Sequence, residues 1–263
     1  MGWYIVSFYF LSVKSLYMNL FWAALLGFIQ GLTEFLPVSS SGHLVIAQSL
    51  IPNFSQPGVL FDVVLHGGTL VAVLYYFRKK LLSLNTRYAL FLTVGTIPAV
   101  IAAIFFGNFL EGLFSDSKWI SWELMATGVL NILVDFIPKG KGLITLKNSF
   151  LVGVAQAISI IPGISRSGAT IFTGVALKAD RRQVAEFSFL LSIPAILGAM
   201  VFQLGKYGVG VIEHPVFYFT GFLISLTVGF LSIGIVFKFL FEKRFKFFGI
   251  YCIALGLAFL LFR

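Results

Sequence analysis

Residues 27–43, GFIQGLTEFLPVSSSGH, bring a carboxylate, a run of hydroxyl groups and an imidazole into one short stretch. Glu34 stands between apolar residues, and three serines and His43 follow Pro37. Such groups move protons and act as nucleophiles. Proline cannot continue a helix and disfavours a helical conformation at the residue before it. The stretch therefore predicts a helix that breaks beside a cluster of reactive side chains.

A second stretch, residues 153–170 with the sequence GVAQAISIIPGISRSGAT, repeats this pattern around Pro162 and Gly163. Its Arg166 carries a planar fork of N–H groups that suits phosphate oxygens, and the amides at the start of a helix attract anions. A nucleophile, a proton-transferring group and an arginine are the groups that phosphoryl transfer requires. We therefore predict that the two stretches face each other and form one site.

The residue types suggest a role for each member of this site. Gln30 and Glu34 are four residues apart and share one helical face. Ser40 is either the nucleophile, with His43 as its acid/base partner, or a phosphate ligand while His43 attacks phosphorus. Glu34 either holds a metal ion or orients His43, and Arg166 stabilises charge on the phosphoryl group. We predict as catalytic Glu34, Ser40, His43 and Arg166, and as substrate-binding Gln30, Ser39, Ser41, Ser165, Ser167 and Gly168.

Some of these residues also allow a structural interpretation. Glu34 and Arg166 would form an ordinary ion pair, although ionisable groups inside a membrane are functional by default. One of the serines at 39–41 is expected to cap a helix. Three further pairs are predicted to be structural or supporting: Gln30 and Gln156 as interhelical hydrogen-bonding groups, Asp62 and His66 as interfacial or second-layer residues, and Arg182 with Glu186 as a local ion pair.

The composition is that of a membrane protein. Of 263 residues, 59% are hydrophobic and only 11% are charged, whereas about a quarter of a soluble domain is charged. The net charge of +9 is explained by basic loops that orient the chain, so nucleic acid is not an expected partner. Cys252 is the only cysteine, which excludes an intrachain disulfide and cysteine-based zinc clusters.

The apolar runs predict the helices that position the site. Residues 1–17 are too short and too interrupted by Lys14 to span a bilayer, so they are predicted to be an N-terminal extension or an interfacial helix. Residues 18–263 form a single membrane domain. Spans are predicted at 59–77, 88–107, 119–137, 185–204, 216–237 and 245–262, with broken segments at 20–50 and 149–176.

The two halves of this domain look duplicated. A shift of 126 residues, the separation of Gly27 from Gly153, brings matching residues into register. The pairs are Gly27 with Gly153, Gln30 with Gln156, Ser39 with Ser165, Ser41 with Ser167, Gly42 with Gly168, Phe61 with Phe187, Phe91 with Phe217 and Gly95 with Gly221. The repeats would cover about 20–137 and 146–263.

Charge predicts how the halves are oriented. The loops at 78–87, 139–147, 178–182 and 238–246 are basic, and basic loops face the cytoplasm. This alternation works only if neither broken segment crosses the membrane, so that one enters from outside and the other from the cytoplasm. The predicted architecture is an all-α inverted-topology repeat of about six transmembrane helices and two re-entrant broken hairpins, which meet near the bilayer midplane.

The motifs QGLTEFLPVSSSGH and PGISRSGAT, with the later FSFLLSIPAILGA, resemble those of the undecaprenyl-diphosphatase family of the bacitracin-resistance type, and the resemblance covers residues 18–263. It implies hydrolysis of undecaprenyl diphosphate to undecaprenyl phosphate and inorganic phosphate. That step recycles the lipid carrier for peptidoglycan and other envelope polymers. The family works in the bacterial inner membrane, on its outer side, with help from Mg²⁺ or Ca²⁺, and its fold has interdigitated inverted repeats with re-entrant helices.

The resemblance also implies residue roles and partners. The family serine, histidine and arginine match Ser40, His43 and Arg166, and Glu34 is a candidate metal ligand. The family's acidic motif has Glu or Gln, three residues, then Glu; here Gln30 leaves one carboxylate fewer to hold a metal. Expected partners are a polyprenyl diphosphate lipid, membrane lipids and a second copy of the chain in a homodimer.

Two other functions compete with this one. Inverted repeats with broken helices are also transporter features, so a lipid-phosphate transporter or flippase using the same anion site is the main alternative. Transport needs an anion site but no nucleophile. A non-catalytic bacitracin-binding or assembly protein fits the reactive groups poorly.

Overall fold

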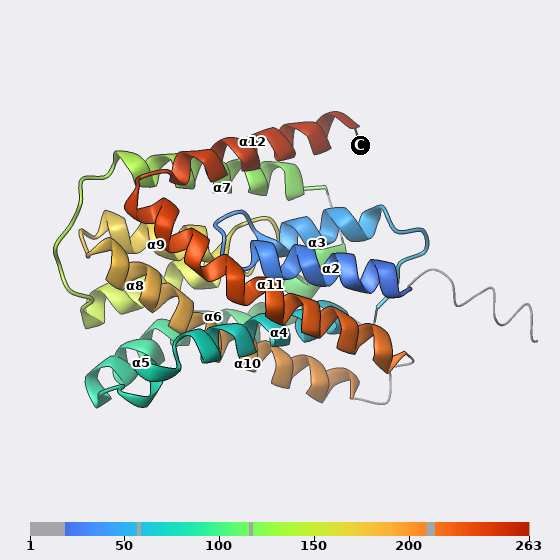
Figure 1. The fold of residues 1–263 in the computed structure, drawn as a ribbon, viewed down its shortest axis with the longest axis horizontal. Coiled ribbons are helices and arrows are strands. Elements are labelled where there is room, and N and C mark those ends of the chain that lie inside the picture. The colour runs from blue at the N-terminus through green and yellow to red at the C-terminus, as the bar shows by residue number, and fades with distance from the viewer. Residues whose placement is uncertain (1–18, 57–58, 116–117, 209–213, 263) are drawn as a thin grey trace, which may run out of the picture.

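The computed structural model describes residues 19–56, 59–115, 118–208 and 214–262, and every extended regular element within them is a helix (Figure 1). The prediction for residues 1–17 lies outside the described residues. In chain order the helices are α2 (Leu20–Thr33), α3 (Ser40–Ser49), α4 (Leu60–Tyr76), α5 (Arg78–Leu82), α6 (Thr86–Ser115), α7 (Ile120–Phe136), α8 (Leu146–Ile158), α9 (Arg166–Ala176), α10 (Arg181–Tyr207), α11 (Pro215–Phe241) and α12 (Phe245–Phe262).

Four of these helices are long and apolar enough to cross a bilayer: α6, over Thr86–Leu110, and the whole of α10, α11 and α12. This agrees with the predicted all-α membrane protein. At 17 residues each, α4 and α7 are somewhat shorter than the roughly 20 residues that a span requires. The count of six spans therefore stays a prediction.

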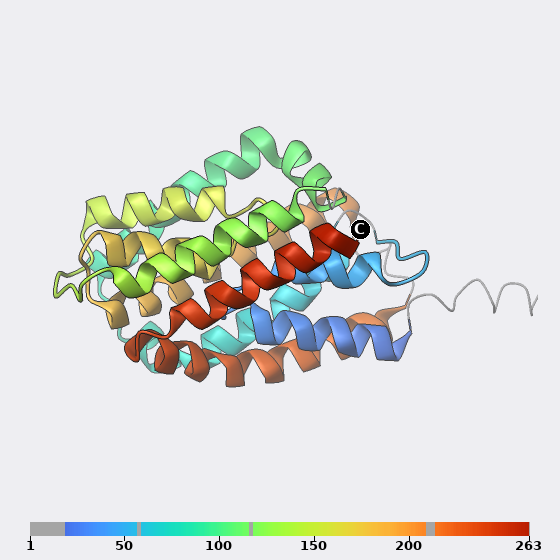
Figure 2. The same cartoon turned by 90° about the horizontal axis from the view of Figure 1, so that it is seen from above.

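Both broken segments form helical hairpins where the sequence predicts them. The first hairpin is α2 and α3, interrupted by the turn that holds Pro37, and the second is α8 and α9. Ser39, at a φ of 69°, caps α3 by accepting a hydrogen bond from Gly42 N at 3.2 Å. Ser165 caps α9 in the same way, from Gly168 N at 3.1 Å. The predicted capping is confirmed, and in Figures 1 and 2 the two hairpins enter the bundle from opposite ends.

The helix boundaries follow the same shift of 126 residues as the sequence. Leu20 and Leu146 begin α2 and α8, Ser40 and Arg166 begin α3 and α9, and Phe136 and Phe262 end α7 and α12. The helix contacts follow the same shift, because α2 packs on α11 and its counterpart α8 packs on α6. Each half therefore contributes a hairpin that packs on a long helix of the other half.

Both of these helix pairs touch at glycines. A Cβ atom added at Gly27 would lie 2.5 Å from the carbonyl oxygen of Gly221, and one added at Gly153 would lie 2.3 Å from that of Gly95. Only glycine permits backbones to approach this closely, as is common between membrane helices. These four residues are two of the pairs that the sequence shift aligns.

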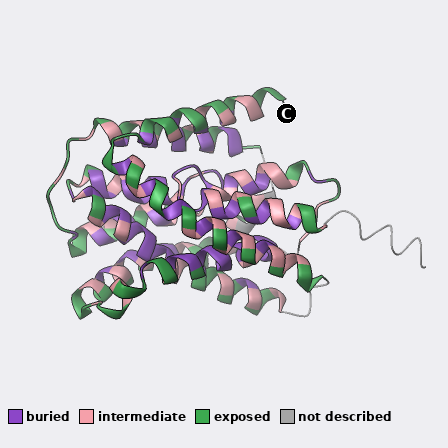
Figure 3. Ribbon diagram, in the orientation of Figure 1, coloured by how far each residue is buried: buried purple, intermediate pink, exposed green. Residues whose placement is uncertain are grey.

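Side chains are buried toward the middle of the bundle and exposed around it (Figure 3). The largest core cluster includes Phe35, Phe187 and Phe189, each with no exposed surface. Large apolar side chains such as Ile104 and Phe105 of α6 are more than 70% exposed. An exposed apolar belt of this kind is what lipid requires of a helix that faces it.

The basic connections share one end of the molecule. In Figure 1 the α4–α6, α7–α8, α9–α10 and α11–α12 connections all lie at the end opposite the last turn of α12. Arg182 pairs with Glu186 at 3.0 Å, as predicted, and Lys80 also pairs with Glu186. The buried Arg181, which the sequence did not single out, donates to the carbonyl oxygens of Val134 and Leu240 and so ties the ends of α7 and α11 together.

Candidate functional site

The two hairpin breaks meet in the middle of the bundle. Ser167 Oγ donates a hydrogen bond to the carbonyl oxygen of Leu36 at 3.1 Å, which joins the second hairpin to the first. Helix α7 holds both breaks: Asn131 Nδ2 donates to the Pro37 carbonyl, and Thr127 Oγ donates to the Gly163 carbonyl at 2.9 Å. The predicted meeting of the two stretches is confirmed.

Glu34 lies at the centre of this junction with 7% of its surface exposed. Its Oε2 accepts hydrogen bonds from Gln30 Nε2 at 2.9 Å and from Ser40 Oγ at 2.7 Å. Its Oε1 accepts one from Arg166 Nη2 at 2.6 Å. Burying a carboxylate without partners is costly, so these donors are what keep it charged. The carboxylate is thus placed to take the proton of Ser40.

Arg166 is the first residue of α9 and reaches across to the first hairpin. Its Nη1 donates to the carbonyl oxygen of Ser188 on α10 at 3.2 Å, which fixes the plane of the guanidinium. A guanidinium has five N–H donors, and these two bonds occupy two of them. Within the described residues no other hydrogen bond of this guanidinium is found, and Arg166 lines a cavity where its charge can attract an anion.

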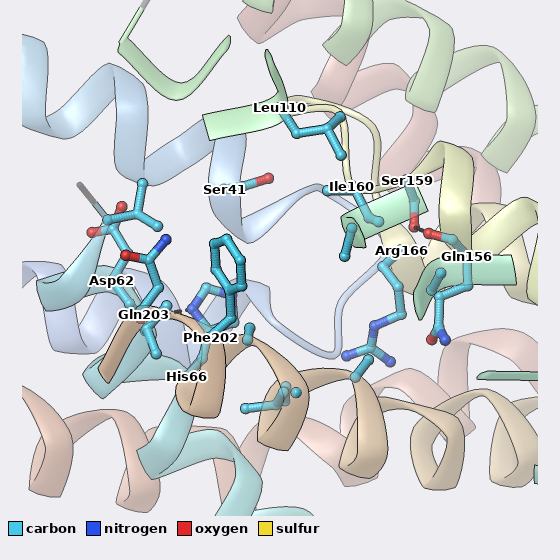
Figure 4. A pocket seen from close by; sticks show the side chains of 18 of the residues that line it. Ser41, Asp62, His66, Leu110, Gln156, Ser159, Ile160, Arg166, Phe202 and Gln203 are labelled. Carbon is cyan, nitrogen blue, oxygen red and sulfur yellow. Dashed lines mark hydrogen bonds between the residues drawn. The ribbon is translucent and has the colours of Figure 1, made fainter. Parts of the chain in front are cut away.

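A cavity of about 440 Å³ opens beside this ion pair (Figure 4). Its polar floor comes from the two hairpins and from the start of α4. Its walls come mostly from α6 and α10 and are largely apolar, and they include Ala99, Ala103, Ala195 and Ala199. A polar end joined to an apolar slot suits a ligand with a charged head and a hydrocarbon tail.

The cavity divides the predicted site residues into two groups. Its lining contains Glu34, Ser39, Ser40, Ser41, Ser165 and Arg166. The other four are not part of that lining. Gln30 bonds to Glu34 from behind, Ser167 is used in the bridge to Leu36, and Gly168 donates its amide to the Ser165 cap.

The structure does not bring His43 to the cavity. Helix α3 begins at Ser40, so His43 completes its first turn, with Nδ1 2.7 Å from the carbonyl oxygen of Ser39. Its Nε2 lies 2.7 Å from the hydroxyl oxygen of Tyr251 on α12, and the two rings stack at 5.6 Å. The acid/base role predicted for His43 therefore lacks a contact with Ser40. Its observed contacts instead hold the serine turn against α12.

The histidine that faces the carboxylate is His66, which sequence reasoning placed in a supporting role. Its Nε2 lies 3.4 Å from Glu34 Oε2, and its Nδ1 lies 2.7 Å from the carbonyl oxygen of Asp62. Both His66 and Asp62 line the cavity. The signal in the sequence was that Asp62 and His66 are two polar residues four positions apart in a largely apolar helix.

The Glu34 carboxylate is a poor fit to a resident metal ion. A divalent cation needs several oxygen ligands, whereas both oxygens of Glu34 already accept hydrogen bonds from cationic or amide donors. Among the described residues no group of three His, Cys, Asp or Glu side chains is arranged to hold a metal. The expectation of Mg²⁺ or Ca²⁺ stays a prediction, and no step below depends on it.

Comparison with known proteins identifies the family. Residues 23–258 match the family described as bacitracin resistance protein BacA. The chain is 39% identical over 255 residues to an undecaprenyl-diphosphatase of Syntrophotalea carbinolica, covering 91% of this chain and 97% of the relative. It is 38% identical to undecaprenyl-diphosphatase 4 of Bacillus thuringiensis subsp. konkukian, covering 91% and 96%, and 36% identical to an undecaprenyl-diphosphatase of Christiangramia forsetii, covering 93% and 98%. The chain therefore belongs to the bacitracin resistance protein BacA family.

Proposed function

We propose that this chain hydrolyses undecaprenyl diphosphate to undecaprenyl phosphate and inorganic phosphate. The observation that carries the proposal is the array of Ser40, Glu34 and Arg166 at the polar end of a cavity with apolar walls. The relatives named above are called undecaprenyl-diphosphatases. The activity would recycle the carrier lipid for cell-wall synthesis, in keeping with a family described by bacitracin resistance.

In the mechanism we propose, Ser40 is the nucleophile. Its Oγ attacks the terminal phosphorus, its proton passes to Glu34 Oε2, and undecaprenyl phosphate leaves with the bridging oxygen. Water then attacks the phosphoserine, Glu34 returns its proton to the leaving Ser40 oxygen, and inorganic phosphate is released. Arg166 stabilises the charge on the phosphoryl oxygens through its remaining N–H groups. The short contact between Ser40 and Glu34 favours Ser40 over His43, whose ring lies against Tyr251.

We further propose the bacterial inner membrane as its location, with six spans, two re-entrant hairpins and an active site open to the outer side. The basic connections at one end support a cytoplasmic orientation of that end. The cavity extends toward the end of the molecule opposite the basic connections, since its lining includes Val59 before α4 and Phe114 near the end of α6. The homodimer stays a prediction. The transporter alternative gains no support from the comparisons.

The test is phosphate release from undecaprenyl diphosphate by the purified protein in detergent. We expect release by the wild type and a fall of at least about 100-fold in Ser40→Ala, because a nucleophile acts as a unit with its base. Ser49→Ala is the matched control, since Ser49 is exposed at the end of α3 and its hydroxyl donates to the Ile46 carbonyl of the same helix. Equal rates in Ser40→Ala and the control would rule out the mechanism.

The same assay tests whether the reaction requires a metal ion. Release measured with and without a chelator, followed by readdition of Mg²⁺ or Ca²⁺, shows whether the reaction requires a divalent cation. No release by folded wild-type protein under any of these conditions would overturn the proposed function.

A further inference from the structure

Gln156 carries a buried amide for which the described residues offer no hydrogen-bond partner. It lies on α8, two residues from the end of that helix, and only 2% of it is exposed. Neither Oε1 nor Nε2 makes a hydrogen bond within the part of the chain that the structure describes. Buried polar groups nearly always make hydrogen bonds, so an amide without a protein partner is expected to bind a ligand or a water molecule. Gln156 also lines the cavity described above.

The other half of the molecule shows what this amide lacks. Gln30 is the counterpart of Gln156 under the shift of 126 residues, and its Nε2 donates to Glu34, four residues further on. The residue four after Gln156 is Ile160, which also lines the cavity and carries no acceptor. The second hairpin thus keeps the donor of the first and has lost its internal acceptor. A ligand oxygen is the natural replacement.

The surroundings of Gln156 favour an anionic oxygen. Arg166 supplies positive charge, and Ser165 caps the start of α9, where helix amides favour anions. Ser159 Oγ donates to the Gln156 carbonyl at 2.7 Å, which fixes the turn that carries the amide. Figure 4 shows Arg166, Gln156 and Ser159 gathered at one side of the cavity, with His66 and Asp62 at the other.

We infer that Gln156 is a phosphate-binding residue, and that it holds the phosphate which stays on the lipid. The inference rests on the proposed function for its choice of ligand. Ser40 Oγ and Arg166 Nη2 both bond to the Glu34 carboxylate, so the attacked phosphorus must lie beside Ser40 and Arg166. In the view of Figure 4, Gln156 lies on one side of Arg166, and Ser41 and His66 lie on the other. A diphosphate that spans the guanidinium therefore places its second phosphate at Gln156, with Nε2 donating to it.

Gln156→Met tests the inference because it keeps the length of the side chain and removes the amide. Ligand binding is measured by thermal shift with undecaprenyl phosphate and, separately, with inorganic phosphate, so neither measurement requires turnover. We expect at least about tenfold weaker binding of undecaprenyl phosphate, as for loss of a hydrogen bond to a charged group. Binding of inorganic phosphate and the melting temperature without ligand should stay unchanged. Gln183→Met, outside the cavity lining, is the matched control and should bind both ligands as the wild type does.

Each other result overturns the inference. A lower melting temperature with unchanged ligand affinity would make Gln156 a structural residue. Weaker binding of inorganic phosphate alone would assign Gln156 to the phosphate that leaves. Failure of the proposed function would be seen separately, because the wild type would then release no phosphate. Even then, loss of undecaprenyl phosphate binding in Gln156→Met would identify the phosphate-binding subsite.

Discussion

Glu34 accepts hydrogen bonds from two donors of its own hairpin and one of the other hairpin, and a histidine faces it from α4. The fourth neighbour is His66, and substituting it tests whether a polar group beside Glu34 supports the reaction. His66→Leu removes the polar ring nitrogen 3.4 Å from Glu34 Oε2, and we expect kcat to fall by about tenfold or more, the effect of removing a polar partner from a buried charged group. His66→Gln keeps an N–H donor on a side chain of similar reach and should retain more of the activity. Equal losses in both variants would show that a polar group beside Glu34 at this position is unimportant.

His43 gives a second prediction at this scale. If it acts by holding the Ser39–Ser41 turn, the phenol that anchors it should matter as well. Tyr251→Phe removes the hydroxyl 2.7 Å from His43 Nε2, and we expect about a three- to tenfold lower rate of phosphate release, the range for one neutral hydrogen bond. An unchanged rate in Tyr251→Phe beside a large loss in His43→Ala would instead favour a direct chemical role for His43.

The two histidines also show where the sequence was informative. A spacing of four predicted that Gln30 and Glu34 share one helical face, and their side chains do bond there, whereas the sequence had suggested a bond between helices for Gln30. The same kind of local reasoning favoured His43, three residues from Ser40. Contacts between helices decide the outcome, because Tyr251 lies 208 residues from His43 and no spacing in the sequence encodes that pairing. His66 reaches Glu34 for the same reason.

At the scale of elements, the glycine contacts between the halves should limit what the helices tolerate. Gly27→Ala and Gly153→Ala would each place a Cβ against the backbone of the opposing helix, so we expect each to cost about 1–3 kcal/mol, the range for overpacking. Thermal unfolding in detergent measures the loss.

Gly234→Ala on α11 is the matched control, because an added Cβ there would have no described atom within 4 Å apart from the neighbouring backbone of its own helix. A gain in helix propensity of up to about 1 kcal/mol is expected for it. If Gly27→Ala were as stable as Gly234→Ala, the close crossing of α2 and α11 would not be essential.

The sequence predicted the elements better than their packing. Pro37 and the Pro162–Gly163 pair located both breaks, because the chemistry of proline acts on its own neighbours. The part played by α7 was not predicted. Thr127 and Asn131 read as ordinary polar residues of a span, and only the fold reveals that they bond to the two breaks.

At the scale of the whole molecule, orientation in the membrane is testable because Cys252 is the only cysteine and is buried. The wild type is therefore its own unlabelled control. New cysteines are placed at Leu50, Leu82 and Leu143, which are 70%, 90% and 68% exposed. A membrane-impermeant maleimide should label Leu50→Cys in spheroplasts, whereas Leu82→Cys and Leu143→Cys should react only after the membrane is opened. Labelling of Leu82→Cys in sealed spheroplasts would reverse the proposed orientation.

The ion pair between Glu34 and Arg166 joins residues that are 132 positions apart in the chain. A ribosome adds about 5–20 residues per second, so the carboxylate emerges roughly 7–26 s before the guanidinium that will neutralise it. During that interval Gln30, Ser40 and, once α4 is made, His66 can lie beside Glu34, but the guanidinium is still absent. The nascent hairpin is therefore expected to keep Glu34 near water or protonated, and to settle in the membrane only when the second hairpin arrives. The pairing of these two charges would then be a late step in the biogenesis of this protein, and the catalytic centre could form only after the second hairpin is made.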